Sequence, residues 1–202
     1  MSNYNPEKHH RRSIRLKGYD YAQEGLYFIT LCCQNRLHLF GVIDNGKMEL
    51  NSYGIIANQE WLNSPIIRKN IQFHEFIIMP NHIHGIIEIL YQEKRRSNQD
   101  IGKFKSPSQT IGAIIRGYKI ATIKRIKDYI KTRASTGELQ FARTKQFAPR
   151  EKDIAEEIIK LDYKIWQRNY YEHIIKTARA YNNISNYIIN NPRNWKEDKL
   201  NK

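Results

Sequence analysis

Residues 73–90, FHEFIIMPNHIHGIIEIL, decide the fold, because two apolar runs in them are separated by a single Pro-Asn turn. Phe73–Met79 and His82–Leu90 are short and mainly apolar, as is typical of buried strands. Pro80 and Asn81 leave room only for a tight turn, so we expect the two strands to be antiparallel neighbours. The apolar residues around the turn indicate that the second strand is central in its sheet.

Two segments toward the N-terminus also have strand character. Leu26–Cys33 is short and rich in β-forming residues, as expected for a buried strand. Phe40–Ile43 and Met48–Leu50 flank Asn45-Gly46, a dipeptide that is typical of a β-hairpin turn. The sequence therefore predicts a strand and then a hairpin before the central pair.

Helices are predicted by caps, prolines and the spacing of apolar residues. Asn51 or Ser52 caps a helix that runs to about Leu62 and is stopped by Pro65. The Ser-Pro pair at 106–107 opens a long helix with a basic outer face. This order of elements predicts an α+β domain with helices over an antiparallel sheet. The last predicted elements are a short helix around Ile154–Leu161, a strand over Tyr170–Ile175 and a helix over Thr177–Ile189.

The length of 202 residues suits one ordinary domain, so we expect 1–202 to fold as a unit. Residues 1–24 are a basic, weakly patterned arm, which either lies along phosphates or is a solvated tail. Residues 132–163 are interpreted as an insertion. Adjacent Cys32 and Cys33 point to opposite faces of a strand and lack the spaced partners of a zinc site, so we expect core packing in a reducing cytoplasm.

The charge of the chain restricts its partners. It has 34 Lys and Arg residues against 20 Asp and Glu residues, a net charge of +14. This excess favours an acidic polymer, of which nucleic acid is the commonest, although a basic surface can also serve solubility alone. No apolar run approaches the roughly 20 residues that span a bilayer, and the start of the chain has no signal-peptide pattern. We expect no membrane partner and a cytoplasmic, nucleoid-associated protein.

His82 and His84 form the first candidate site. Residues two apart on a strand share a face and lie about 7 Å apart at Cα, so the two imidazoles can converge on one ion while Ile83 points into the core. Imidazole suits Zn, Mn, Ni or Fe, and it serves Mg only with oxygen ligands and water. The alternative is two polar residues on an exposed face. A nucleic-acid deaminase is excluded because the chain has no Pro-Cys-x-x-Cys.

Tyr187 is the second candidate, and Asn191 lies four residues later on the same helical face. A phenol with a pKa of about 10 is a poor nucleophile unless cations polarise its target phosphate. Its phosphotyrosine product conserves the energy of the broken bond, which strand-transfer enzymes need and hydrolases do not. The alternative is that Tyr187 packs in the core and Asn191 caps the helix. Because Asn191 precedes Pro192, helical geometry is disfavoured at that residue.

The chain resembles the REP-associated tyrosine transposases, relatives of the small HUH (His-hydrophobic-His) insertion-sequence transposases. The matching motifs span most of the chain in order, and the runs around the histidines and at 166–173 are the most specific. The motifs are RLKGYDY at 15–21 before YFIT at 27–30, MPNHIHG at 79–85, IGAIIRGYK at 111–119, WQRNYYEH at 166–173, and YI at 187–188 with NP at 191–192.

The resemblance implies a ferredoxin-like antiparallel sheet of the HUH endonuclease type, with the histidines on a central strand. It implies that Tyr187 is the nucleophile and that His82, His84 and Asn191 hold Mg²⁺ or Mn²⁺. The implied substrate is single-stranded DNA with hairpins, cut to a 5′-phosphotyrosine and a free 3′-OH. The sequence is also compatible with a homodimer.

DNA contacts are expected from the arm, the long helix and the C-terminal motif. A structural role is the alternative for each of these contacts. The basic residues could form a solvated face, and Trp166 and at least one of Tyr170 and Tyr171 could pack in the core. For His173, a DNA contact and a satisfied core position are equally weighted. The expected DNA-binding residues are Arg11, Arg12, Arg15, Lys17, Arg116, Lys119, Trp166, Arg168 and His173.

Two other functions stay open at this point. The first is a binding protein that grips hairpin DNA or RNA and regulates without cutting. The second is a metal-dependent phosphodiesterase that uses water and never becomes joined to its product. Both histidines and the tyrosine are present together, which favours the strand transferase.

Overall fold

The computed structural model describes residues 19–91, 109–136 and 151–201. Several predictions fall outside these ranges. The helix start at 106–107 lies outside the described residues, as do the arm residues Arg11, Arg12, Arg15 and Lys17.

Four antiparallel strands form the main sheet, in the order β4-β5-β1-β6. The predicted central strand, β5, pairs with β1 on one side and with β4 on the other. Along the chain, these strands alternate with helices as strand-helix-strand-strand-helix-strand, the ferredoxin-like arrangement. The α+β prediction is therefore confirmed. The strands are β1 (Gly25–Cys32), β4 (Ile71–Met79), β5 (His82–Ile89) and β6 (Tyr171–Ile175).

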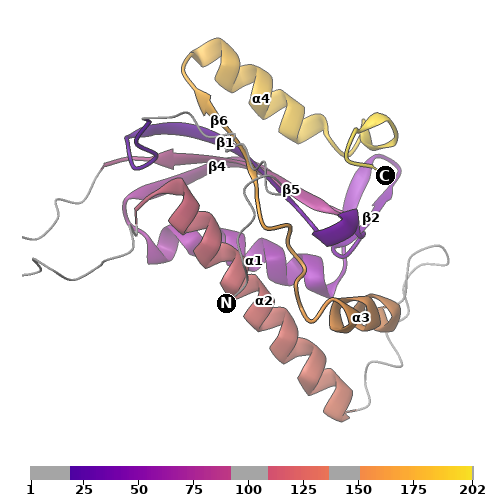
Figure 1. Ribbon diagram of the computed structural model, residues 1–202. Coiled ribbons are helices and arrows are strands. Elements are labelled where there is room, and N and C mark those ends of the chain that lie inside the picture. Colours follow the sequence, from indigo (N-terminus) through magenta and orange to yellow (C-terminus); the bar gives the residue numbers. More distant parts are fainter. Residues whose placement is uncertain (1–18, 92–108, 137–150, 202) are drawn as a thin grey trace, which may run out of the picture.

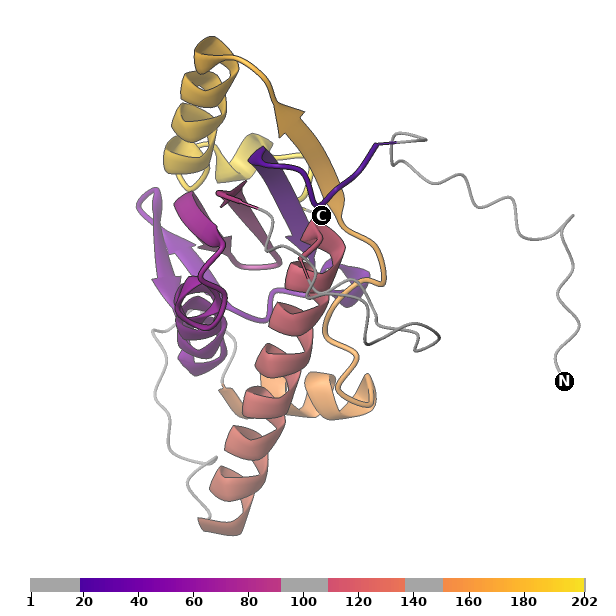
Figure 2. The same cartoon turned by 90° about the vertical axis from the view of Figure 1, so that its left-hand side faces the viewer.

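Helices cover both faces of this sheet (Figure 1). Helices α1 and α2 lie on one face and α4 lies on the other, while the long α2 extends beyond the sheet toward α3 (Figure 2). The predicted hairpin forms a separate two-stranded sheet of β2 and β3. In the described ranges, no helix has the length and apolar character to cross a membrane. The bounds are β2 (Gly41–Asp44), β3 (Lys47–Leu50), α1 (Ser52–Ile67), α2 (Ile111–Thr136), α3 (Glu151–Lys160) and α4 (Ala178–Asn190).

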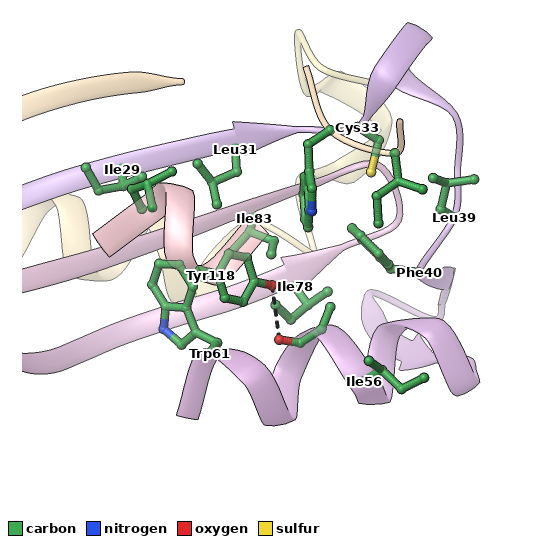
Figure 3. Packing of buried hydrophobic residues seen from close by; sticks show 14 of the residues in the cluster. Ile29, Leu31, Cys33, Leu39, Phe40, Ile56, Trp61, Ile78, Ile83 and Tyr118 are labelled. Atoms are coloured by element: carbon green, nitrogen blue, oxygen red, sulfur yellow. Dashed lines mark hydrogen bonds between the residues drawn. The ribbon is translucent and has the colours of Figure 1, made fainter. Parts of the chain in front are cut away.

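The main core lies between the sheet and α1 and α2. Ile83 of β5 is fully buried there with Trp61 of α1 and Tyr118 of α2 (Figure 3). The Tyr118 hydroxyl donates to the Ala57 carbonyl at 3.0 Å, so the one polar atom of that ring is satisfied. The opposite face buries a smaller cluster under α4, made of Phe28, Ile86, Ile175 and Ile188.

One predicted helix boundary was wrong. Helix α1 begins as predicted, because the Asn51 side chain accepts from the Gly54 N–H at 2.9 Å, but it continues through Pro65 to Ile67. Proline there removes only one backbone donor near the end of the helix, and the Arg68 N–H still donates to the Ser64 carbonyl at 3.0 Å, which closes the last turn. Helix α2 continues to Thr136, so the first residues of the predicted 132–163 insertion are helical.

Helix α3, inside that predicted insertion, belongs to the core. Its residues Ile154 and Ile158 are buried in the main cluster. The Tyr53 hydroxyl of α1 donates to the Glu151 carbonyl at 3.1 Å, and the Ser52 hydroxyl donates to the Glu151 carboxylate. The start of α3 is thus tied to the start of α1. That 132–163 is an insertion stays a prediction.

Gly85, between the main core and the histidine face, tests the packing of the sheet. A methyl group at this position would collide with the Trp61 ring. We expect Gly85→Ala to lower the free energy of unfolding by about 1 to 3 kcal/mol, as overpacking does. The matched control is Gly117→Ala in α2, where a methyl would meet only the movable end of the Arg68 side chain at 3.4 Å. That variant should be neutral or up to about 1 kcal/mol more stable, as measured by urea unfolding. Equal effects of the two variants would contradict this packing.

Candidate active site

His82 and His84 lie side by side on the face of β5 that α4 covers. Their ring centroids are 4.4 Å apart, and the side chains are 0% and 2% exposed, respectively. Ile83 points to the opposite face, into the main core, as predicted. The alternative of two polar residues on an exposed sheet face was therefore wrong. Buried imidazoles need partners, and those partners define the site.

Asn81 fixes the tautomer of His82. Its amide Nδ2 donates to the Leu200 carbonyl at 2.7 Å and to the Arg36 carbonyl at 3.3 Å, which turns Oδ1 toward His82 Nδ1 at 2.8 Å. An amide oxygen only accepts, so Nδ1 of His82 carries the hydrogen and Nε2 has a free lone pair. Nε2 is buried and has no hydrogen-bond partner among the described residues. This is the arrangement in which imidazole is ready to bind a metal.

His84 has partners at both ring nitrogens. Nδ1 lies 2.8 Å from the Thr30 hydroxyl on the neighbouring strand, and Nε2 lies 3.1 Å from the Tyr187 hydroxyl. Burial lowers the pKa of His84 well below its usual range, and neighbouring His82 lowers it further. Burial likewise lowers the pKa of His82 to about 4. Both rings are therefore neutral at neutral pH, which is the form that binds metal ions.

Tyr187 reaches the site from α4. Its side chain is 44% exposed, and its hydroxyl end lies at His84. Burial raises the pKa of Tyr187, and the Asp198 carboxylate raises it further. The alternative of a core tyrosine was wrong, because nearly half of the side chain is open to solvent. A phenol in this position needs a cation, or the proton acceptor beside it, before it can attack.

Asn191 is both the helix cap and part of the site. It is the C-terminal cap of α4 with φ −55° and ψ −42°, so the local preference imposed by Pro192 is overridden. The side chain is 1% exposed, and its Nδ2 donates to Asp198 Oδ2 at 2.9 Å. Its Oδ1 is buried without a hydrogen-bond partner among the described residues. Asn191 can therefore cap the helix and also offer an oxygen to the site, so these two interpretations are compatible.

Asp198 is the residue of the site that the sequence did not predict. The ligand atoms of His82, His84 and Asp198 all lie within 4.8 Å of one another. No spacing rule connects an acid in the run Lys-Glu-Asp-Lys to a mid-chain strand. Only the turn after α4, with its short 3₁₀ helix Trp195–Glu197, returns the chain to the histidines.

These residues fit a divalent ion. Two buried atoms, Asn191 Oδ1 and His82 Nε2, have no hydrogen-bond partner in the described structure. The Asp198 carboxylate belongs to the same cluster. Two neutral imidazoles with carboxylate and amide oxygens suit Mn²⁺, and also Mg²⁺ when water completes its shell. The donor set therefore supports a metal site, without identifying the metal.

A bulge in β4 positions α4. The register of β4 and β5 shifts between Phe73 and Phe76. Beside it, the hydroxyls of Tyr181 and Ser185 on α4 donate to Glu75 Oε2 at 2.9 and 3.1 Å. These contacts hold the helix that carries the nucleophile candidate against the sheet edge.

The residues expected to contact DNA are placed differently from one another. The prediction that Trp166 contacts DNA was wrong. Its side chain is 6% exposed and its ring packs against Phe40 and Tyr118, so no face is open to a base. Lys119 is also buried in part, and its ammonium donates to the Gln167 and Asn169 carbonyls at 2.7 and 3.2 Å, which makes it a structural contact instead of a phosphate clamp. The residues of this set that are exposed are Arg116, Arg168 and His173.

A cavity of about 890 Å³ opens over the site. His84, Tyr187, Asn191 and Asp198 line one part of it. The cavity continues over β1 and the start of β6, so there is room beside the nucleophile candidate for a group the size of a nucleotide.

One relative is similar over almost its whole length. An uncharacterized protein of Haemophilus influenzae is 42% identical over 203 residues, which cover 98% of this chain and 96% of that protein. The chain belongs to the family of that protein. No family model matches the sequence.

Two solved structures of transposase type are similar to this chain. One is a REP-associated tyrosine transposase bound to a REP hairpin, with 16% identity and a TM-score of 0.48 over 98% of this chain and 77% of that one. The other is a transposase candidate of Deinococcus radiodurans, with 13% identity and a TM-score of 0.38 over 88% of this chain and 97% of that one.

The buried histidines predict a loss of stability in acid. Because the pKa of His82 is about 4 in the folded chain and about 6.5 when unfolded, protons bind more tightly to the unfolded chain between these values. The stabilisation is complete above pH 6.5 and is lost as the pH falls toward 4, on the order of 2 to 3 kcal/mol. Urea unfolding from pH 7 to pH 4 measures it. His82→Gln should make the loss shallower, whereas His173→Gln, at an exposed residue, should leave it unchanged. Identical slopes for all three proteins would contradict the burial of His82.

Proposed function

We propose that this chain is a metal-dependent single-strand DNA endonuclease and strand transferase that forms a 5′-phosphotyrosine intermediate. The observation that carries the proposal is the 3.1 Å contact between the Tyr187 hydroxyl and His84 Nε2, beside the cluster of His82, His84 and Asp198. The Tyr187 phenol, the His84 imidazole and the Asp198 carboxylate line one cavity, and the neutral His82 imidazole lies beside His84. Of the common reaction classes, covalent phosphoryl transfer uses all of them.

His82 Nε2, His84 Nε2, an Asp198 oxygen and Asn191 Oδ1 would hold Mg²⁺ or Mn²⁺. When bound, the ion supplies Lewis-acid polarisation of the scissile phosphate. Asn81 and Thr30 act by orienting the two rings through Nδ1, which leaves Nε2 of each ring directed at the site.

Tyr187 would act as the nucleophile. Its oxygen forms a bond to phosphorus, the bond from phosphorus to the 3′-oxygen breaks, and the leaving 3′-oxygen takes up a proton as the tyrosine gives one up. The product is a tyrosine diester on the 5′ side and a free 3′-OH. Attack by another 3′-OH reverses the step and joins new ends without ATP. Because the pKa of Tyr187 is raised, the phenol stays protonated at neutral pH and gives up its proton only as it attacks.

The chemistry of the site and the resemblance of the motifs both favour single-stranded DNA with a hairpin as the substrate. The basic residues Arg116, Arg168 and Lys199 are exposed around the domain, and the net charge of +14 favours a polyanion. A regulator that binds hairpins without cutting needs none of the buried donor set. A phosphodiesterase that uses water needs the metal but not Tyr187.

The decisive test replaces the nucleophile. Tyr187→Phe removes one oxygen on a half-exposed side chain, so it should abolish the covalent protein–DNA adduct while changing DNA affinity less than threefold. The measurement is a denaturing gel with labelled hairpin-bearing single strands and Mn²⁺. The matched control is Tyr163→Phe, at a tyrosine that packs under Lys127 outside the cavity, which should still form the adduct.

Mass spectrometry of the digested adduct then identifies the modified peptide. Adduct formation by Tyr187→Phe would exclude Tyr187 as the nucleophile. Cleavage by the wild type without any adduct would favour hydrolysis by water, and binding without cleavage would favour the regulator.

A second test removes a metal ligand. Asp198→Asn retains the shape of the side chain but removes its charge, so Mn²⁺ affinity measured by calorimetry should fall at least tenfold, about 1.4 kcal/mol. Glu197→Gln, at the exposed neighbouring acid outside the cluster, should leave the affinity unchanged. Equal affinities for both variants and the wild type would remove Asp198 from the site.

A further inference from the structure

The cavity over the site has a second part that the proposed chemistry does not use. Beyond Tyr187 it is lined by Phe28, Tyr171, Gln167 and Asn169. Tyr171 is 52% exposed, although it lies on a strand of the main sheet, and its ring meets the edge of Phe28 with centroids 6.3 Å apart. Because β6 is the edge strand of the sheet, about half of this side chain stays open to solvent beside the cavity.

The register of the sheet fixes the distance between the two parts of the cavity. Thr30 of β1 pairs with His84 on one side and with Tyr171 on the other, so His84 and Tyr171 share a face two strands apart. Two strand spacings are about 10 Å. This span suits one nucleotide, with its phosphate at the histidines and its base at Tyr171.

The amide-bearing wall is rigid. The Gln167 backbone N–H donates to the Cys32 carbonyl at 2.9 Å, and its side-chain Nε2 donates to the Cys33 carbonyl at 3.2 Å. Lys119 holds the same segment from the other side through the carbonyls of Gln167 and Asn169. Burial lowers the pKa of Lys119 to about 8, consistent with an ammonium enclosed by protein. Side-chain amides on such a wall can read the edge of a base.

We propose, building on the proposed function, that this part of the cavity is a subsite for one unpaired nucleobase next to the scissile phosphate. The base stacks on Tyr171, and the amides of Gln167 and Asn169 contact its edge. The Glu197 carboxylate also lines the cavity, and its charge disfavours a second phosphate there but not a neutral planar group. The Lys119 ammonium is a positioning group for this wall.

The test uses the full chain and a hairpin-bearing strand drawn from a random pool by binding to it. Each unpaired nucleotide of that strand is replaced in turn by an abasic unit, and then by the fluorescent base 2-aminopurine. We expect one abasic position to weaken equilibrium binding 10- to 100-fold, the range for one stacked base. At that position, 2-aminopurine fluorescence should be quenched on binding.

Variants assign the effect to the subsite. Tyr171→Ala should weaken binding tenfold or more, abolish the quenching and make the sensitive abasic substitution silent, whereas Tyr171→Phe should behave like the wild type. Tyr163→Ala, at a tyrosine outside the cavity that packs under Lys127, is the control and should have no effect. If the losses of binding caused by Tyr171→Ala and by the abasic unit were additive, the proposed subsite would be wrong. Fluorescence quenching that persists in Tyr171→Ala would also contradict it.

The readouts separate the two proposals. Binding and quenching report on the subsite whether or not the strand is cut, and the covalent adduct reports on the nucleophile alone. Quenching that depends on Tyr171 without any adduct would support the subsite and contradict the transferase. A covalent adduct that forms equally well with every abasic substitution would support the transferase and contradict the subsite.

Discussion

Two imidazoles enclosed between a sheet and a helix are the constraint on which the rest of this structure depends. His82 and His84 are almost fully buried, and desolvation makes their charged forms costly, so each ring is neutral and its nitrogens need defined partners. Thr30 and Asn81 supply one partner for each ring. One nitrogen of each ring lies within 4.8 Å of the other and of an Asp198 carboxylate oxygen, so the candidate ligand atoms are gathered in one place.

The C-terminal segment is part of this arrangement because it closes over the histidine face. The Asn81 amide binds the Leu200 carbonyl, and the Arg36 guanidinium donates to the Lys199 carbonyl at 3.1 Å. The same segment delivers Asp198, whose Oδ1 accepts from the Leu200 N–H at 2.7 Å. The β4–β5 turn therefore orients His82 and anchors the residues that complete the site. Helix α4 contributes from the other side, because the bulge in β4 fixes where its hydroxyl-bearing face lies.

Local patterns predicted the parts of this structure that local physics controls. Alternation on β5 placed His82 and His84 on one face and Ile83 in the core, and helical spacing placed Tyr187 and Asn191 together. The helix end that was predicted wrongly is the one at Pro65, which lies in the last turn of α1, where a proline removes only one backbone donor and does not stop the helix.

The parts that the sequence missed depend on long-range contacts. Asp198 reaches the histidines only through the path of the chain after α4. Trp and Lys are residue types that often contact DNA, yet Trp166 packs in the core and Lys119 donates to backbone carbonyls. Their burial depends on neighbours that are distant in sequence. The exposed Tyr171 and the buried Trp166 lie in one motif, but Tyr171 begins the edge strand β6, whereas Trp166 packs in the main core.

Anomalous diffraction from crystals soaked in Mn²⁺ tests the central claim most directly, since it locates the ion without reference to activity. The account predicts one strong peak bonded to Nε2 of both His82 and His84 and to an oxygen of Asp198 or Asn191, with the Tyr187 hydroxyl next to it. Manganese bound only elsewhere, or an empty histidine face with Tyr187 turned away, would contradict it.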